Sequence, residues 1–282
     1  MIAVTGATGQ LGRLAITALK ARVPATDIIA LARDPAKAND LGVAARLADY
    51  QHPATLTAAL AGVDVLVLIS SNDFNDRVGQ HRAVIAAAKA AAVGRIVYTS
   101  ILKGEASPLI LALDHIVTEA DLRASGVPAT ILRNGWYTEN YTGALGGAIA
   151  AGAMIGSFGT GRIATAARRD YAEAIAVVAT GAGHVGKTYE LAGDASYTMD
   201  EMAAEVSRLT GKTIPYNSLP SEVYSGILQG FGLPEALCTA LADADHHGAA
   251  GALFDDSHTL SRLIGRPTTP MAVTVADAVA AL

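Results

Sequence analysis

Three glycines close to the N-terminus have a spacing that suits phosphate chemistry. Gly6, Gly9 and Gly12 follow a short apolar run at residues 2–4 and open an alanine-rich stretch at residues 10–22. Glycine lets the chain turn sharply and approach a pyrophosphate, whose charge is met by the free N–H groups of a helix N-terminus. Because the motif joins an expected strand to an expected helix, it predicts a dinucleotide site; the alternative is a tight turn without a ligand.

A basic residue occupies the position that would select the cofactor. In IIALARDP, residues 28–35, Arg33 ends the second apolar run and Asp34 follows it. A carboxylate there would accept hydrogen bonds from the ribose diol of NAD, whereas a guanidinium suits the 2′-phosphate of NADP. We therefore expect NADP. The alternatives are a solvated Arg33, or Asp34 near the ribose in a shifted register. Asp49, in RLADY, would contact the adenine amino group or cap the next helix.

The acid–base pair of ordinary short-chain dehydrogenases, Tyr-x-x-x-Lys, is absent. The residues four positions before the six lysines are Ile16, Arg33, Ile85, Thr99, Gly183 and Arg208. In the missing pair, lysine lowers the pKa of a tyrosine that protonates a carbonyl oxygen, so unactivated ketones are unexpected substrates. A quinone needs less help, because hydride addition yields a stable hydroquinone monoanion and hydrogen bonds with good stacking suffice. The other interpretation is that no chemistry takes place.

Polar side chains near the ends of two expected strands could assist such a reaction. Asn134 and Tyr137 follow the run at residues 128–133, and Ser100 ends the run at residues 95–100. These three are candidates for hydrogen bonds to a developing oxyanion.

A histidine and a glutamate lie in the segment that would hold the missing pair. His115 and Glu119 are one helical turn apart, so the carboxylate could orient the imidazole as a proton donor. We favour the alternative of an ordinary surface pair. Trp136 and Tyr141 would wall the substrate pocket or pack in the core.

Strand-like and helix-like segments alternate through the first half of the chain. The expected strands are residues 2–4, 27–32, 63–70, 95–100 and 128–133, with one more before Asp49. The expected helices are residues 10–22, 54–62, 81–93 and 114–126. Apolar strands that alternate with helices predict an α/β fold: a Rossmann-type, doubly wound parallel sheet covered on both faces.

The pattern changes after residue 134. Residues 140–161 carry no charge and include seven glycines, which favours a short helix, a turn and a strand over a membrane span. Further expected elements are a helix at 167–181, a strand at 187–193, a helix at 198–211 opened by a Thr198–Glu201 capping box, and short helices over 220–282. We expect an NADP-binding core over 1–192, whose 135–192 strands are shared with the cleft, and a mainly helical substrate-side lobe over 193–282.

Composition excludes several kinds of partner. The net charge is −5 and no Lys/Arg-rich run occurs, so nucleic acid is not an expected partner. The single cysteine, Cys238, fits a reducing compartment, and Met1 leads into a strand without a basic signal segment, so we expect a cytoplasmic protein without membrane association. His246 and His247 lack metal-ligand spacing, and no metal is expected.

Longer segments resemble the NmrA-like group of atypical short-chain dehydrogenases. The segments that show this similarity are GATGQLG, ARDPAKA, LADY, LISS, YTS, LRNGWYTENY, YELAG and LFDDSHTLSRLIGRPTT. Within the group, the chain is most similar to bacterial NADPH-dependent quinone oxidoreductases of type 2, with triphenylmethane reductases as near relatives. The resemblance implies a Rossmann core, NADPH as hydride donor and a planar aromatic acceptor stacked on the nicotinamide.

The resemblance also implies roles for individual residues. The pyrophosphate would be held by Gly6, Ala7, Thr8, Gly9, Gln10 and Leu11, and the 2′-phosphate by Arg33. The ribose would lie beside Ser70 and Ser71, and the nicotinamide and substrate would be bordered by Asn134, Gly135, Trp136, Tyr137 and Glu139.

Three functions fit these features. The leading interpretation is a reductase of quinones or similar planar acceptors, assisted by Tyr137, Asn134, Ser100 or His115. The second is a nonenzymatic NADP(H)-binding redox sensor that docks on a regulatory partner, as NmrA proteins do. The third is a carbonyl reductase in which His115 replaces the tyrosine. The oligomeric state is left open, and a homodimer is compatible with the sequence.

Overall fold

The computed structural model describes residues 1–73 and 75–282, which group into two structural units. The first unit comprises Met1–Gly104, Leu113–Asn134 and Arg168–Tyr189. The second comprises Glu105–Ala112, Gly135–Ala167 and Glu190–Leu282. The chain passes from the first unit to the second for the last time between residues 189 and 190, close to the boundary expected at residue 192. Residues 135–167, in contrast, group with the C-terminal part of the chain.

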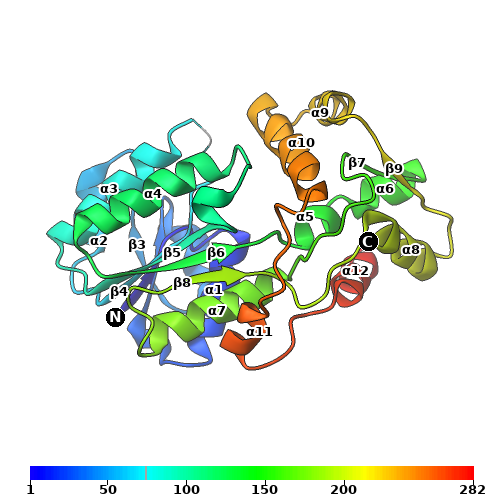
Figure 1. Cartoon of the computed structure of the whole chain (residues 1–282). Coiled ribbons are helices and arrows are strands. Elements are labelled where there is room, and N and C mark those ends of the chain that lie inside the picture. The colour runs from blue at the N-terminus through cyan, green and yellow to red at the C-terminus, as the bar shows by residue number, and fades with distance from the viewer. Residues whose placement is uncertain (74) are drawn as a thin grey trace. The chain divides into compact units, whose positions relative to one another are not determined.

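A seven-stranded sheet forms the centre of the Rossmann core, in the order β3-β2-β1-β4-β5-β6-β8 (Figure 1). Its strands are β1 (Ile2–Val4), β2 (Ile28–Ala32), β3 (Ala44–Leu47), β4 (Val65–Leu68), β5 (Arg95–Ile101), β6 (Ala129–Asn134) and β8 (Thr188–Leu191). Every pair from β3 across to β6 is parallel. The central strands are apolar because helices cover both of their sides, and all five residues of β2 are buried. The expected doubly wound parallel sheet is confirmed.

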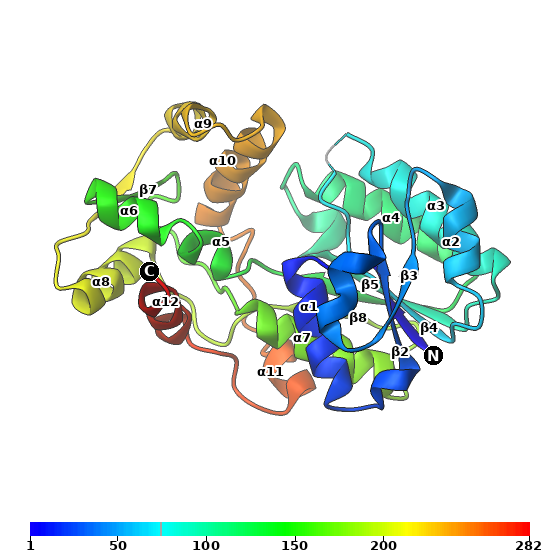
Figure 2. The ribbon, with the colours of Figure 1, turned by 180° about the vertical axis from the view of Figure 1, so that it is seen from behind.

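Helices of the first unit lie along both faces of this sheet (Figures 1 and 2). One face carries α2 (Pro53–Ala59), α3 (Arg77–Ala90) and α4 (Ala112–Ser125), and the other carries α1 (Gln10–Lys20) and α7 (Arg168–Thr180). In α1 the buried Leu11, Ala15 and Leu19 recur at helical spacing, which makes one apolar stripe. Helix α3 begins four residues earlier than the start expected at residue 81.

The strand order reverses at β1, which has β2 on one side and β4 on the other. In open parallel sheets, ligands bind outside the carboxyl ends of the strands at such a reversal. The segments that follow β1 and β4 meet there: the Thr5 N–H donates to the carbonyl of Val67, and the Ile69 N–H donates to Thr5 Oγ1, both at 3.0 Å. The fold therefore places the glycine motif beside Ser70 and Ser71.

The second unit is mainly helical, as expected. Its elements are α5 (Glu139–Thr142), α6 (Leu145–Ala151), β7 (Met154–Gly156), α8 (Met199–Thr210), β9 (Tyr216–Ser218), α9 (Ser221–Gly230), α10 (Glu235–Ala249), α11 (Thr259–Ile264) and α12 (Met271–Ala280). The capping box of Thr198 and Glu201 opens α8, and prolines stand directly before α9, α10 and α12. Across residues 1–73 and 75–282, no helix has the length and apolar character needed to cross a bilayer.

Candidate dinucleotide site

The glycine turn is shaped so that larger side chains would not fit. Gly6 has a φ of +58°, a left-handed conformation that favours glycine. Gly9 is the N-cap of α1, and its N–H donates to the Gly6 carbonyl at 2.9 Å. A Cβ on Gly12 would come within 2.2 Å of the Gly6 oxygen. The turn is thus pressed against α1, whose first turn contains no acidic residue and suits an anion.

A pocket opens over this turn and holds about 440 Å³, a volume typical of ligand sites. It is lined by Thr5, Gly6, Thr8, Gly9, Gln10, Leu11, Gly12, Leu31, Ala32, Arg33, Ala48, Asp49, Tyr50, Gln51, Ile69, Ser70, Ser71, Asn72, Asp73 and Gln80. The cofactor residues predicted in this part of the chain are Gly6 to Gly12, Arg33, Asp49, Ser70 and Ser71. Of these, only Ala7 lies outside the pocket lining, because it is fully buried. The pocket combines backbone N–H groups at a helix start with a single guanidinium, and this set of donors fits a phosphorylated dinucleotide.

Arg33 and Asp34 separate at the end of β2. Arg33 lines the pocket, is exposed, and forms no hydrogen bond with any residue that the structure describes. Asp34 does not line it; its carboxylate accepts the Ala36 N–H at 3.1 Å and caps the 3-10 helix Pro35–Leu41. The alternative of Asp34 as a ribose ligand therefore loses support, because this residue lies outside the pocket lining and caps the 3-10 helix instead.

Asp49 lies in the pocket, and its side chain is held by Gln51 and His52. Its carboxylate accepts the Gln51 N–H and faces His52 Nδ1, both at 3.0 Å, and these hydrogen bonds lower its pKa. The N-cap of α2 is His52, so Asp49 does not cap that helix. Sequence reasoning missed Tyr50 next to it, a pocket residue whose hydroxyl contacts Thr5. The tyrosine directly after LAD was the available signal.

The histidine and glutamate of α4 do not form the surface pair that we favoured. His115 and Glu119 are only 7% and 1% exposed, because their helix face packs against the sheet. His115 Nδ1 lies 2.7 Å from the Tyr98 hydroxyl, and burial holds its pKa well below the usual value. Glu119 therefore does not orient it, and a ring whose pKa lies well below the usual value is not protonated at neutral pH, so it cannot serve as an imidazolium proton donor.

Glu119 is instead the centre of a buried ionic cluster. Its carboxylate accepts the Ser100 hydroxyl at 2.6 Å and a two-pronged contact from Arg133 at 2.9 and 2.7 Å. Burial disfavours the charge, but the hydrogen bonds from Arg133 and Ser100 lower the pKa of Glu119 overall. At the place where short-chain dehydrogenases hold an acid–base pair, this chain has a neutral histidine and a fixed ion pair.

Residues 134–139 lie at the end of β6 and just beyond it. Asn134 and Trp136 are buried, whereas Tyr137 and Glu139 are partly exposed. From Gly135 onward the segment belongs to the second unit, and the Gly135 N–H donates to the Leu191 carbonyl at 2.7 Å. None of these residues belongs to the lining of the dinucleotide pocket, and their contact with nicotinamide or substrate stays a prediction.

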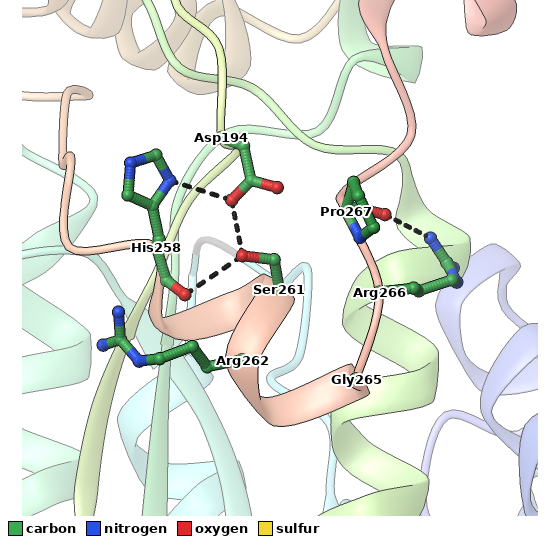
Figure 3. A pocket seen from close by; sticks show the side chains of 7 residues that line it. All are labelled: Asp194, His258, Ser261, Arg262, Gly265, Arg266 and Pro267. Carbon is green, nitrogen blue, oxygen red and sulfur yellow. Dashed lines mark hydrogen bonds and ion pairs between the residues drawn. The ribbon is translucent and has the colours of Figure 1, made fainter.

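A second hollow in the second unit combines a serine, a histidine and an aspartate (Figure 3). Asp194 Oδ1 accepts the Ser261 hydroxyl at 2.6 Å and lies 3.1 Å from His258 Nδ1. In a nucleophilic triad the serine would donate to the imidazole, but here it donates to the carboxylate. Asp194 also accepts the Thr268 N–H, so it fastens α11 and the segment after it. We assign this cluster a structural role.

The remaining histidines at the end of α10 show no ligand arrangement. His247 Nε2 lies 3.5 Å from Asp243 one turn before it, while His246 is exposed. Within the described part of the chain, no group of three or more His, Cys, Asp or Glu residues is placed to hold a metal ion.

Comparisons with known proteins agree with this geometry. The NmrA-like family matches residues 1–263. Quinone oxidoreductase 2 of Escherichia coli is 51% identical over 278 residues, which are 98% of this chain and 97% of that protein. The structure of an Escherichia coli NADPH-dependent quinone oxidoreductase in complex with NADPH superposes with a TM-score of 0.95 at 50% identity, covering 98% and 99% of the two chains. Citrobacter triphenylmethane reductase with NADP(H) gives 0.92 at 36% identity, covering 99% and 100%.

Proposed function

The chain belongs to the NmrA-like family, and we propose that it is an NADPH-dependent oxidoreductase that transfers hydride to a quinone or a similar planar, electron-poor acceptor. The observation that carries the proposal is the absence of an acid–base pair from a site that otherwise fits the dinucleotide. The glycine turn leaves no room for a Cβ at Gly12, and the exposed Arg33 stands at its side.

This chain's residues would bind and orient NADPH, which supplies the hydride when bound. Gln10 to Gly12, in the first turn of α1, offer N–H groups to the pyrophosphate. Arg33 offers a planar, permanently charged fork to the 2′-phosphate. Ser70 and Ser71 border the same pocket from the end of β4 and would lie along a ribose.

Acceptor reduction would depend on hydrogen bonds rather than on a strong acid. Of the catalytic candidates, Ser100 donates to Glu119, and His115 is buried in its neutral form. Tyr137, a partly exposed residue, is the remaining candidate that carries a hydroxyl, and we propose that it donates to the oxygen on which charge develops. Such a site serves an acceptor that becomes aromatic on reduction and fails with a simple ketone.

The test is a panel of acceptors assayed for NADPH consumption: a benzoquinone, a naphthoquinone, a triarylmethane dye and a simple ketone. We expect rapid turnover of the quinones and little or none of the ketone. Good ketone turnover that is lost in His115→Ala would replace the proposal with carbonyl reduction. NADPH binding without consumption of any acceptor would favour the redox sensor instead.

A cytoplasmic location is part of the same proposal. It is supported by the single cysteine, Cys238, which is buried in α10 and forms no disulfide.

A further inference from the structure

Three side chains of α3 hold one residue of the dinucleotide pocket. Arg77 Nε donates to the Ser71 carbonyl at 2.7 Å, and the Ser71 hydroxyl donates to Gln80 Oε1 at 2.6 Å. The Ser71 N–H donates to His81 Nε2 at 2.9 Å. The spacing i, i+3, i+4 puts the three side chains on one face of the helix. Every polar group of Ser71 is therefore hydrogen-bonded to a side chain of α3.

The same three side chains are almost completely buried, at 6% for Arg77, 7% for Gln80 and 0% for His81. Burial of a guanidinium, an amide and an imidazole is costly unless each finds specific partners. An apolar α3 face would pack against the sheet with less difficulty. The polar side chains on this face of α3 therefore serve to bind the segment that follows β4, rather than to pack the helix against the sheet.

The hydrogen bonds fix the tautomer of His81. Because Nε2 accepts the Ser71 N–H, the proton of the neutral ring lies on Nδ1. Nδ1 lies 2.9 Å from Thr118 Oγ1, whose own hydroxyl donates to the Asp114 carbonyl at 2.8 Å. Thr118 can therefore accept from His81, and α4 holds the ring with its lone pair aimed at Ser71. Burial, with a contribution from Arg77, lowers the pKa of His81 to about 3 and keeps this lone pair free.

We propose that His81 is a positioning residue for dinucleotide binding: through the Ser71 N–H it sets the segment 69–73 at the distance from the glycine turn that the dinucleotide requires. The proposal rests on the proposed function for its ligand, NADPH. His81 does not line the pocket, whereas Ser71 and Gln80 do, so His81 acts through Ser71. Its loss would weaken NADPH binding without altering the transfer of hydride from bound NADPH.

Two polar substitutions separate the contacts of the ring. Gln reaches the place of Nε2 and can still accept the Ser71 N–H, whereas Asn reaches only the place of Nδ1 and keeps the Thr118 contact. We expect His81→Asn to raise the Kd and the KM for NADPH about tenfold, with kcat at saturating NADPH changed by less than about twofold. His81→Gln should stay within about threefold of the wild type in all three quantities.

Thr130→Val is the matched control. It removes one buried hydrogen bond, from Thr130 Oγ1 to the His184 carbonyl at 2.8 Å, from a fully buried residue outside the pocket. It should lower the thermal stability and leave the Kd for NADPH unchanged. An equal loss of affinity in Thr130→Val, or equal Kd values for His81→Asn and the wild type, would overturn the proposal, as would a failure of His81→Gln to restore binding.

Hydrogen exchange of the Ser71 amide gives a readout that needs neither variant nor ligand. In the wild-type protein this amide should exchange slowly, and exchange at the rate of an open loop would contradict the proposal even if a variant does not fold. A wild-type protein that fails to bind NADPH would refute the proposed function, while the exchange of Ser71 would still test the hydrogen bond to His81.

Discussion

Two neighbouring charged residues at the end of β2 differ in location, because Arg33 lines the pocket and Asp34 does not. The carboxylate of Asp34 already accepts a backbone N–H, whereas the guanidinium of Arg33 stays in the pocket with carboxylates in its surroundings. Its positive charge contributes to lowering the pKa of Asp49 and of Asp73, behind the larger effects of their local hydrogen bonds. A phosphate would give Arg33 a charged hydrogen-bonding partner, which none of the described residues provides.

Arg33→Ala tests this assignment. The change should weaken NADPH binding by about 1.5–3 kcal/mol, roughly ten- to a hundredfold, because a charge-assisted fork to the 2′-phosphate is lost. NADH lacks that phosphate, so its affinity should barely change. Fluorescence titration of both cofactors measures the difference, and equal losses would remove Arg33 from the phosphate site.

Tyr137→Phe tests the hydrogen bond to the acceptor. Loss of one donor to a developing oxyanion should lower kcat/KM for a quinone by roughly ten- to a hundredfold, well short of abolishing turnover. The Kd for NADPH should not change. Tyr189→Phe is the control, because it removes a hydroxyl that lies 2.8 Å from His184 Nδ1, away from the pocket lining. Wild-type rates in Tyr137→Phe would leave the chain without a named donor.

The two residues in the place of the acid–base pair show what spacing can and cannot reveal. The i, i+4 spacing of His115 and Glu119 correctly places both on one face of α4, but it does not say whether that face is solvated. The partners that decide their chemistry, Tyr98 for the histidine and Arg133 for the glutamate, come from β5 and β6. Only the assembled sheet brings them within hydrogen-bond distance.

At the scale of elements, apolar runs located the strands well and the helix starts less well. The strands β1, β2, β5 and β6 lie within one residue of the predicted limits, because parallel strands buried on both faces are apolar along their length. Helix α3 begins at Arg77, inside a polar stretch that resembles a loop. Polar side chains at the start of this helix point inward and bind Ser71. The usual apolar signal of a buried helix face is therefore missing from the sequence.

Gly12→Ala tests the contact between the glycine turn and α1. The new methyl would overlap the Gly6 oxygen and lie 2.8 Å from Ala7 Cα, so either the helix or the turn must move. We expect a loss of about 2–4 kcal/mol in the free energy of unfolding, together with loss of NADPH binding.

Gly147→Ala is the matched control, because it makes the same change inside helix α6 where nothing lies within 4 Å of the new Cβ. Because alanine has a higher helix propensity than glycine, this variant should be at least as stable as the wild type, with an expected gain of about 0.5–1 kcal/mol in the free energy of unfolding. Chemical denaturation measures both variants. Equal stabilities would show that the turn can relax and that Gly12 is not required by packing.

At the scale of the whole molecule, the chain passes between the two units several times, at residues 104–105, 112–113, 134–135, 167–168 and 189–190. The crossing at 134–135 coincides with a change in the sequence, where the alternation of strands and helices stops and a glycine-rich stretch follows, whereas the other four crossings show no comparable change. A sequence pattern can reveal linkers and the periodicity of helices and strands. Which structural unit a segment belongs to depends instead on which distant segments it packs against. The change of pattern after residue 134 coincides with the start of the segment 135–167, but it does not by itself show that this segment packs with the C-terminal part.

The free energy of unfolding of the whole chain should depend on pH through buried groups with opposite signs. His81, with a pKa near 3 in the folded chain, gains a proton more readily when unfolded, so its contribution falls as the pH drops from about 6.5 toward 3. Asp245 acts the other way. It is 4% exposed, and burial raises its pKa to about 6 despite hydrogen bonds from the Ser157 N–H and the Tyr141 hydroxyl.

Asp245→Asn isolates the second contribution. Above pH 6 the folded chain buries a charged Asp245, which destabilises it relative to the unfolded chain, and this cost disappears as the pH falls through about 6 toward 3.8. The amide keeps an oxygen for the Ser157 N–H without the charge, so the variant should be more stable than the wild type by about 1–2 kcal/mol near pH 8. The gain should shrink toward zero near pH 4. Urea denaturation across this range measures it, with Asp27→Asn, at an exposed carboxylate, as the control for lost charge. A gain that is constant with pH, or a variant less stable than the wild type at pH 8, would show that the carboxylate of Asp245 stabilises the fold in its charged form.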